Sequence, residues 1–385
     1  MRIAVYHNLP SGGAKRALYE YITRLRHSHK IDLYNLSTSE ENFFDLRPHV
    51  NKVYTYEFRV KKLPIISKGY NLIFTLKKLE KQIAEDIDSK KYDVVFVNHC
   101  QFIQSPFILR FLKTPSVYYC QEPRRVSYEY NFKIKHNSNI KSIIGNYLLS
   151  KEDEINARSA NIILANSYFS MESIYKSYGL ESKVCYLGID SSKFKSLDGH
   201  KINKNRKVVS VGALDPAKGF EFIIKSIALV PTEIRPKLII ISDRWDPSYK
   251  EYILKLARQL FVNVRTLRRV SDHKLIDIYR SSRLTLCGAH LEPFGFTALE
   301  SMSCKTPVIA VKEAGFRETV TKGGILVDRD KQKFAEAIVD VSENYELLNR
   351  LGEEGESYVR EKWTWELSVK NLETFLQKAS ANGNN

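Results

Sequence analysis

Two carboxylates, Glu292 and Glu300, flank a short turn in the segment LEPFGFTALE, with seven residues between them. The turn at residues 293–295 precedes a predicted helix start at Phe296 or Thr297. The first amides of a helix lack intrahelical acceptors and lie at the positive end of its dipole, which suits a phosphate. A carboxylate on either side can accept hydrogen bonds from hydroxyls, which is the polarity pattern of a sugar nucleotide. Two ordinary surface carboxylates explain this segment equally well when it is taken alone.

Length and composition indicate a folded protein with more than one domain. The chain has 385 residues, of which 43% are hydrophobic, as expected for a globular protein of two domains. No apolar run approaches the ~18 residues that a membrane span requires, and the N-terminus becomes polar too early for a signal peptide. The five cysteines are widely spaced without a C-x-x-C pair. We therefore expect small buried cysteines in a reducing compartment, with neither disulfides nor a zinc site.

The net charge of +16 fits a nucleic acid, an anionic membrane, a polyanionic ligand or simply a lysine-rich solvated surface. Basic and apolar residues interleave in residues 58–82 and 132–149. This composition is typical of elements that lie on an anionic membrane, and also of ordinary amphipathic helices with a lysine-rich outer face. We expect no nucleic-acid partner, because the sequence shows neither an aromatic–basic recognition motif nor a helix-turn-helix pattern.

The order of predicted elements indicates an α/β fold that is built twice. An apolar strand at residues 2–6 leads into a glycine loop and then a helix with a 3.6-residue apolar period, and this pattern restarts at residues 207–211. We predict two Rossmann-like, doubly wound domains that face a cleft. The predicted boundaries are 1–190 for the first domain, 191–206 for a polar linker, 207–365 for the second domain, and 366–385 for a C-terminal helix that packs back towards the first domain.

Two further features are placed to reach a ligand in such a cleft. Lys218 follows a strand of the second domain, where a lysine suits a diphosphate, although a surface lysine accounts for it equally. Gly12 and Gly13 permit close approach of the backbone to a phosphate or a sugar. A tight turn without any ligand explains these glycines as well, because the pattern is not G-x-G-x-x-G.

Several of these segments occur together, and in the same order, in one family. The chain resembles the family 4 glycosyltransferases of group 1 type, which are retaining enzymes of GT-B architecture. The matching segments span almost the whole chain and are GGAKRA, ANSYFSMESI, YLGIDSSKF, VGALDPAKGFEFIIKSI, RRVSDHKLIDIYRSS and EPFGFTALESMSCKTPVIAVKEAGFRETV. The last segment is the most specific, because E-x7-E is combined there with TPVIA and with a preceding DHKL helix.

The resemblance implies a role for each matched position. Glu292 would hold sugar hydroxyls of the donor, Glu300 the ribose hydroxyls and Lys218 the diphosphate. Gly12 and Gly13 would let the first domain approach the donor. The other donor-binding residues that it implies are Arg269, Val270, Leu275, Phe294, Gly295, Phe296 and Thr297. We expect no metal and no cofactor, because cationic and helix-dipole charges can serve the leaving diphosphate.

One departure from the family removes a cation. Ala213 stands between Gly212 and Leu214, where the family usually has an arginine, so one expected partner of the diphosphate is missing. The candidates to substitute for it are Arg244, Arg268 and Arg269.

A second departure concerns the first domain. Gln121 occupies a position where many relatives have a histidine, and glutamine donates a hydrogen bond but cannot carry a proton. His99, after the neighbouring strand, is the candidate to contribute instead. A loop histidine with a structural hydrogen bond is an equally good interpretation of His99.

We therefore predict a retaining transferase that moves a hexose from a nucleotide-diphosphate sugar, with Glu292, Gln121 and His99 as the catalytic group. The first domain would bind a lipid-linked or polysaccharide acceptor. The alternative is a non-catalytic GT-B protein that binds a nucleotide sugar or a partner glycosyltransferase. We expect a cytoplasmic location, with peripheral contact to the cytoplasmic face of an anionic membrane through residues 58–82 and 132–149. No sequence pattern identifies the nucleotide, the sugar or the linkage.

Overall fold

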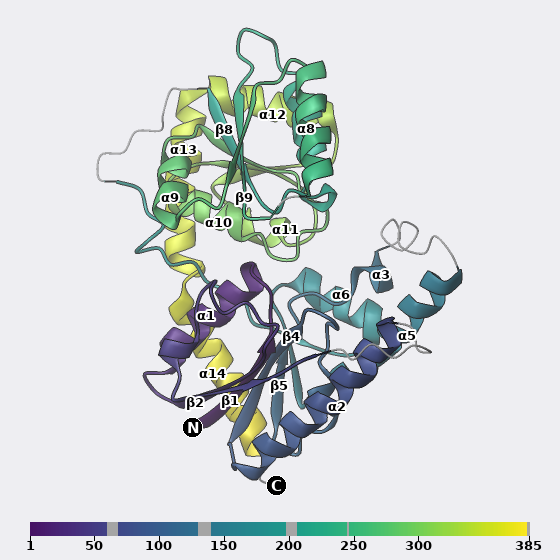
Figure 1. Ribbon diagram of the computed structural model, residues 1–385. Helices are drawn as coiled ribbons and strands as arrows, with labels where there is room; N and C mark the ends of the chain where they lie inside the picture. Colours follow the sequence, from purple (N-terminus) through teal and green to yellow (C-terminus); the bar gives the residue numbers. More distant parts are fainter. Residues whose placement is uncertain (60–67, 130–139, 198–205, 245, 383–385) are drawn as a thin grey trace. The chain divides into compact units, whose positions relative to one another are not determined.

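The computed structural model describes residues 1–59, 68–129, 140–197, 206–244 and 246–382, and the chain divides into two units. Unit 1 comprises Met1–Leu187 and Trp365–Asn385, and unit 2 comprises Gly188–Thr364. Each unit is an α/β domain around a parallel sheet, as the sequence predicts (Figure 1). Parts of the predicted segments 58–82 and 132–149 and of the predicted linker lie outside the described residues.

Unit 1 contains a seven-stranded parallel sheet in the order β3-β2-β1-β4-β5-β6-β7. Its strands are β1 (Arg2–Asn8), β2 (Lys30–Leu36), β3 (Lys52–Tyr56), β4 (Val94–Cys100), β5 (Ser116–Tyr119), β6 (Ile162–Ala165) and β7 (Lys183–Val184). The strand order reverses between β1 and β4, and open α/β sheets bind ligands at the carboxyl ends of the strands beside such a reversal. Strand β3 was not predicted. It lies at the sheet edge with exposed and half-buried residues, so it lacks the apolar run of a central strand.

Helices cover both faces of this sheet. They are α1 (Gly13–Leu25), η1 (Arg47–His49), α2 (Lys68–Ser89), η2 (Phe107–Arg110), α3 (Arg125–Tyr128), α5 (Ile140–Arg158), α6 (Tyr168–Tyr178) and α14 (Trp365–Asn382). Tyr21 of α1 packs edge-on against Trp365 of α14, with ring centroids 5.3 Å apart, and against Tyr119 of β5 at 5.9 Å. The opposite face packs against α2 and α6, through residues such as Ile83 and Ile174. The C-terminal helix therefore completes the core of unit 1 (Figure 1).

Unit 2 contains a six-stranded parallel sheet in the order β10-β9-β8-β11-β12-β13. Its strands are β8 (Lys207–Val211), β9 (Lys237–Ser242), β10 (Val264–Arg268), β11 (Leu284–Cys287), β12 (Val308–Val311) and β13 (Gly324–Val327). Its helices are η3 (Pro216–Lys218), α7 (Phe220–Ile227), α8 (Pro247–Gln259), α9 (Asp272–Arg280), α10 (Phe296–Ser303), α11 (Phe316–Thr319), α12 (Lys331–Glu343) and α13 (Tyr345–Lys362). The strand order reverses between β8 and β11, so the loops that follow these two strands meet at one edge.

The first residues of the predicted linker pack on unit 2. Phe194 is fully buried, and its carbonyl accepts a hydrogen bond from Ser303 Oγ. Ser196 Oγ donates to Glu356 at 2.7 Å. Residues 191–197 therefore form part of unit 2, although their polar composition resembles that of a linker.

Candidate functional site

The loops after β8 and β11 are in contact at the strand reversal of unit 2. Gly219 has φ 68°, and a Cβ at this position would lie 1.8 Å from the carbonyl oxygen of Gly288. Only glycine allows this approach. Lys218 precedes this contact, and its Nζ donates to Glu292 Oε2 over 2.6 Å. The structure thus pairs two residues that are 74 positions apart and that the sequence assigns to one ligand.

The turn before α10 is held in one conformation by packing. Gly295 adopts φ 101°, and a Cβ there would lie 2.9 Å from the ring of Phe316. Phe294 is buried, and its carbonyl accepts a hydrogen bond from Thr319 Oγ1 at 3.3 Å. The predicted helix start is confirmed, because α10 begins at Phe296. Its first amides, including that of Thr297, lie at the positive end of the helix, beside the loop that carries Glu292.

Glu300 lies one turn inside α10 and is buried, so it is not the ordinary surface carboxylate that the sequence left open. The hydroxyl of Tyr279 in α9 donates to Glu300 Oε2 over 3.0 Å. Leu275, which is predicted to border the nucleobase, lies one turn before Tyr279 and is also buried. Sequence reasoning missed Tyr279, although its four-residue spacing from Leu275 places both on one helix face.

The candidate substitutes for the missing arginine follow neighbouring strands. Arg244 comes after β9, Arg268 ends β10, and Arg269 follows it with φ 47° while its amide donates to Ser242 O at 3.2 Å. All three are exposed, and Val270 beside them is half-buried. These strands end at the same sheet edge as β8, so the arginines belong to the edge that carries Lys218. Their role with a diphosphate stays a prediction.

An ion pair that the sequence did not predict lies beneath the Glu292 loop. Arg329 forms a bidentate pair with Glu313, with Nε–Oε1 at 2.6 Å and Nη2–Oε2 at 2.7 Å. The same guanidinium donates to the carbonyls of Gly288 and Ala289, which begin the loop. Glu313 lies in the matched segment that begins at Glu292 and Arg329 lies outside it, and no sequence signal relates the two residues.

In unit 1 the predicted glycine loop lies directly at the start of α1. Gly12 is the N-cap with φ 142° and ψ −174°, a conformation that is nearly restricted to glycine, and Gly13 is the first helical residue. A Cβ on Gly12 would meet no atom of the described residues of unit 1 within 4 Å. Backbone conformation, and not packing within unit 1, therefore requires this glycine.

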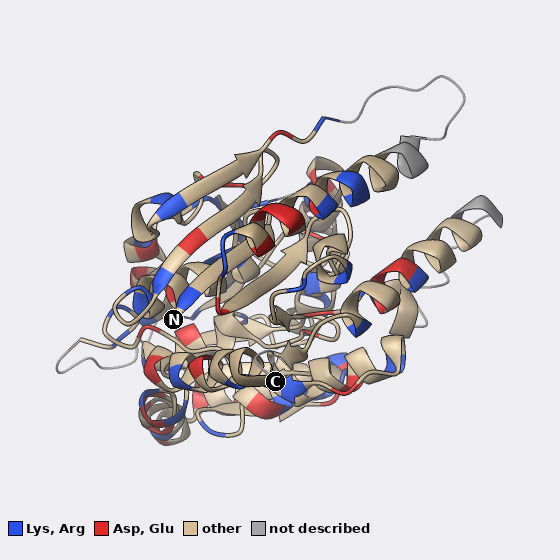
Figure 2. Cartoon of the chain, turned by 90° about the horizontal axis from the view of Figure 1, so that it is seen from below, with Lys and Arg blue, Asp and Glu red and all other residues tan. Residues whose placement is uncertain are grey.

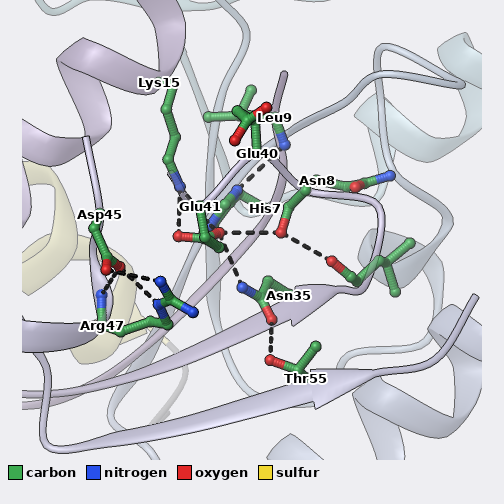
Figure 3. Close-up of polar contacts among 12 residues, drawn as sticks. His7, Asn8, Leu9, Lys15, Asn35, Glu40, Glu41, Asp45, Arg47 and Thr55 are labelled. Carbon is green, nitrogen blue, oxygen red and sulfur yellow. Dashed lines mark hydrogen bonds and ion pairs between the residues drawn. The ribbon is translucent and has the colours of Figure 1, made fainter. Parts of the chain in front are cut away.

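A buried polar cluster lies under this glycine loop and was not predicted (Figure 3). Lys15 Nζ, which is fully buried, donates to Glu41 Oε2 at 2.8 Å, and His7 Nε2 lies 3.2 Å from Glu41 Oε1. Asn35 Nδ2 and Ser39 Oγ also donate to Glu41 Oε1, at 2.9 and 3.0 Å. The cluster joins β1, α1 and the loop after β2. Lysines are mostly exposed, so a lysine in the first turn of a helix is expected at the surface. The sequence pattern therefore did not predict that Lys15 is buried.

The hydrogen bonds of His7 show which nitrogen of its neutral ring carries the proton. The amide of Leu9 donates to Nδ1 at 3.2 Å, so the proton of the neutral ring resides on Nε2, which then donates to Glu41. Burial, followed by the charge of Lys15, lowers the pKa of His7 to about 4. The hydrogen bond that His7 donates to Glu41 opposes this shift but does not reverse it. His7 is therefore neutral at pH 7, and Lys15 and Glu41 carry the charges of the cluster.

The remaining predicted residues of unit 1 lie on two adjacent strands. His99 lies inside β4 and not after it, because β4 extends to Cys100. Burial, and then the neighbouring His7, lower the pKa of His99 to about 4, so it is neutral at pH 7. Gln121 follows β5 and is 8% exposed, and its Nε2 has no hydrogen-bond partner among the described residues. Asn98 is buried, and neither of its amide atoms has a hydrogen-bond partner in the part of the chain that the structure describes. Unpaired buried amides are costly, so both are suited to bind an incoming polar group.

Several other expectations concern the whole chain. All five cysteines are buried and free, as predicted. Among the described residues no cluster of His, Cys, Asp and Glu is arranged to hold a metal ion, and no described helix has the length and apolarity of a membrane span. In the view of Figure 2, basic and acidic positions are interspersed along the helices. Independence from metals stays a prediction.

Residues 192–358 match the family model of glycosyl transferases group 1. The matched residues, which make up most of unit 2, are therefore similar to the group 1 glycosyltransferases. The chain is 30% identical over 189 residues to a probable sucrose-phosphate synthase of Thermosipho melanesiensis, an alignment that covers 47% of this chain and 43% of that protein. An uncharacterized glycosyltransferase of Methanocaldococcus jannaschii is 23% identical over 391 residues, covering 95% of both chains.

Solved structures share the fold of this chain. A sucrose-phosphate synthase from Thermosynechococcus elongatus superposes with a TM-score of 0.78 at 18% identity, covering 99% of each chain. The Anabaena protein HepE, whose structure contains UDP and glucose, superposes with a TM-score of 0.75 at 19% identity, covering 98% of this chain and 100% of that one. Both are GT-B proteins, and the fold class predicted from the sequence is confirmed.

Proposed function

We propose that this chain is a retaining glycosyltransferase that moves a hexose from a nucleotide-diphosphate sugar to a lipid-linked or polysaccharide acceptor. The contact between Lys218 and Glu292 carries the proposal, because it places a cation beside a carboxylate at the strand reversal of unit 2. The N-terminus of α10 adjoins the same loop. A diphosphate with hydroxyls on both sides matches this order of charges.

The donor would replace a contact that the protein makes with itself. The diphosphate attracts the ammonium of Lys218 and the first amides of α10, which releases Glu292 to accept hydrogen bonds from the sugar hydroxyls. Glu300, oriented by Tyr279, accepts from the ribose hydroxyls. The charge that develops on the leaving diphosphate is met by groups that are already in place, so we propose that no metal is required.

Transfer with retention needs no nucleophilic side chain in this proposal. An oxygen of the leaving phosphate takes the proton of the acceptor hydroxyl on the face from which the diphosphate departs, and the protein contributes positioning and charge stabilisation. Gln121, with its unpaired Nε2, donates a hydrogen bond to a sugar hydroxyl. His99 is neutral at pH 7, so it serves as a hydrogen-bonding group and not as a cation.

Relatives support a nucleoside-diphosphate hexose as the donor class. HepE has been solved with UDP-glucose, and a 30% identical protein of Corynebacterium glutamicum is a GDP-mannose-dependent mannosyltransferase. A thermal-shift screen of this chain with UDP-, GDP- and ADP-hexoses distinguishes the bases. A ligand at 100- to 1,000-fold excess over its dissociation constant stabilises the fold by about 3–4 kcal/mol. A flat response to all three donors would count against the proposal.

The alternative is a non-catalytic protein that binds a nucleotide sugar or a partner enzyme. Its support is Gln121, which binds but transfers no proton, together with Ala213 in the place of a cation. A donor that raises the melting temperature but is neither hydrolysed nor transferred across a broad acceptor screen would favour this alternative. Any sugar transfer by the purified chain removes it.

We also propose that unit 1 meets its acceptor at the cytoplasmic face of an anionic membrane. Helix α5 exposes four apolar side chains at helical spacing, which are Ile143, Ile144, Tyr147 and Leu148. Helix α2 exposes Phe74 and Lys78. Both helices pack on η2, since Ile108 N donates to Glu80 of α2 at 2.9 Å and Arg110 pairs with Glu152 of α5. Apolar side chains close to lysines are the composition of an interfacial surface.

Vesicle co-sedimentation tests this surface. Wild type should pellet with vesicles that contain phosphatidylserine and less with neutral vesicles, and the variant Ile144→Glu/Leu148→Glu should lose most of this binding. The charge-reversal variant Lys61→Glu/Lys62→Glu/Lys77→Glu/Lys78→Glu should lose the preference for anionic lipid. The matched control Leu367→Glu changes an exposed leucine of α14. Equal binding by all four proteins would reject the membrane contact without affecting the donor proposal.

A further inference from the structure

We infer that Arg329 and Glu313 act as a clamp that sets the position of Glu292 and thereby determines how tightly the site holds the sugar of the donor. Neither residue is predicted to touch the donor, so both are positioning residues. The inference rests on the proposed function for its ligand. The clamp itself is defined by contacts within unit 2.

The clamp reaches the residues of the loop between β11 and Glu292. Arg329 donates through Nη1 to Gly288 O at 3.0 Å and through Nη2 to Ala289 O at 2.9 Å. Glu313 Oε2 lies 3.3 Å from His290 Nδ1 and 3.5 Å from the amide nitrogen of Leu291. One guanidinium and one carboxylate therefore fix four consecutive residues.

The carboxylate side of the clamp is tied to Glu292 directly. The amide of Gly315, two residues after Glu313, donates to the carbonyl of Glu292 at 2.9 Å. On the other side, the amide of His290 donates to Ala217 O at 2.8 Å, next to Lys218. The clamp thus holds both ends of the ion pair that the donor is proposed to open.

The backbone is strained on both sides of the clamp. Leu291, in the loop after β11, has φ 47°, and Ala314, which follows Glu313 in the loop after β12, has φ 46°, so both lie in the left-handed region. This conformation costs a non-glycine residue about 1–2 kcal/mol, so a loop without contacts would relax and move Glu292. Strain of this kind persists only where surrounding contacts enforce it.

The clamp stays charged over the pH range in which the protein would work. Burial raises the pKa of Glu313, but hydrogen bonds with His290 and Arg329 outweigh this effect and lower it to about 2. The guanidinium also lies 5.3 Å from the ring centroid of Phe222 in α7, which supports it from the other side. A lysine at position 329 would keep the charge but not the fork of donors that reaches Glu313 and both carbonyls.

The test compares Arg329→Lys, Arg329→Met and Glu313→Gln with wild type. The control is Lys333→Met, which removes an exposed ion pair with Asp328 on the same segment. Calorimetry measures the affinity for the nucleoside diphosphate alone and for the hexose donor that the screen identifies. Because a misplacement of about 1 Å costs on the order of 100-fold, the clamp variants should lose the extra affinity that the sugar supplies, and kcat should fall. Diphosphate affinity and the control should stay near wild type.

Hydrogen exchange of the ligand-free proteins gives a second readout. Amides of residues 289–292 should exchange faster in the Arg329 and Glu313 variants, while those of β8 and β9 keep their protection. Unchanged exchange in this loop, or equal losses for diphosphate and donor, would overturn the clamp. If wild type binds no nucleotide, the proposed function fails, and the exchange data still decide whether the clamp holds Glu292.

Discussion

Lys218 Nζ and Glu292 Oε2 are 2.6 Å apart, and their side chains are 29% and 20% exposed. A pair so open to water contributes little to stability, about 0–1 kcal/mol. Its significance is positional, because the two loops that carry it meet at the strand reversal of unit 2. A ligand with a diphosphate and hydroxyls competes for both partners, so the pair marks where the donor is proposed to bind.

Removing the carboxylate of Glu292 should reduce sugar transfer without unfolding the protein. Glu292→Ala should reduce sugar transfer by about 100-fold or more, because a preorganised electrostatic contact to the reacting sugar is lost. The melting temperature should change little, since the pair is only half-buried and contributes little to stability. Steady-state kinetics and thermal unfolding measure the two effects, with Glu251→Ala on the exposed face of α8 as the matched carboxylate control. Wild-type turnover in Glu292→Ala would rule out the assigned role.

The role of Glu300 can be tested with a modified ligand. Glu300→Gln should weaken binding of the nucleoside diphosphate, since hydrogen bonds to charged groups contribute about 1.5–3 kcal/mol. The 2′,3′-dideoxy analogue lacks the hydroxyls that Glu300 is proposed to bind, so the variant and wild type should bind it equally. Calorimetry with both ligands completes the comparison. A loss of equal size with the dideoxy analogue would show that Glu300 supports α9 through Tyr279 and does not bind the ribose.

The buried cluster of unit 1 should be a large contributor to its stability. Glu41→Ala leaves the fully buried ammonium of Lys15 without its carboxylate, and breaking such a pair costs about 3–5 kcal/mol. The double variant Lys15→Met/Glu41→Gln removes both charges and should recover much of this loss. Urea unfolding followed by fluorescence measures both proteins. If Glu41→Ala unfolds at the wild-type midpoint, the pair is not formed in solution.

His7 should give unit 1 a defined pH dependence. Its folded pKa is about 4 and its ordinary value is 6.5, so between these values the unfolded chain binds more protons than the folded one. Stability therefore falls as the pH drops through this interval, by about 3 kcal/mol from His7 alone. Burial raises the pKa of Glu80 and Asp153 to about 7, and these carboxyl groups contribute with the opposite sign.

The comparison must for that reason be made between wild type and His7→Gln, which keeps a hydrogen-bonding side chain. As the pH falls from 6.5 to 4, the unfolding free energy of wild type should decrease more than that of His7→Gln. Urea titrations at four pH values provide this difference. A difference that is constant with pH would show that His7 is not held neutral.

The strands and the helix start at Phe296 could be read from the sequence because apolar runs and a glycine turn are local signals. Strand β3 has no such signal, because an edge strand with exposed residues is specified mainly by its neighbour β2. His99 was placed after its strand for a related reason, since the polar end of β4 resembles a loop.

The site was predictable only where chemistry and local structure coincide. Glu292 and Glu300 lie on either side of a recognisable turn. Lys218 was predicted for the same ligand, but its contact with Glu292 and the contact of Tyr279 with Glu300 are tertiary, so neither contact was predictable. Arg329 and Glu313 are 16 residues apart with β13 between them, and only the parallel pairing of β12 with β13 brings their side chains together.

The division of the chain has a consequence for its synthesis. Unit 2 is continuous in sequence, whereas unit 1 needs α14, the last described helix, to cover Tyr21 and the adjoining strands. A chain that emerges from the ribosome from its N-terminus exposes this apolar face until α14 has been made. All segments of unit 2 are therefore synthesised before unit 1 is complete. Residues 1–187 cannot complete their fold until α14 has been made. A nascent chain that ends before Trp365 should accordingly recruit holding chaperones through unit 1.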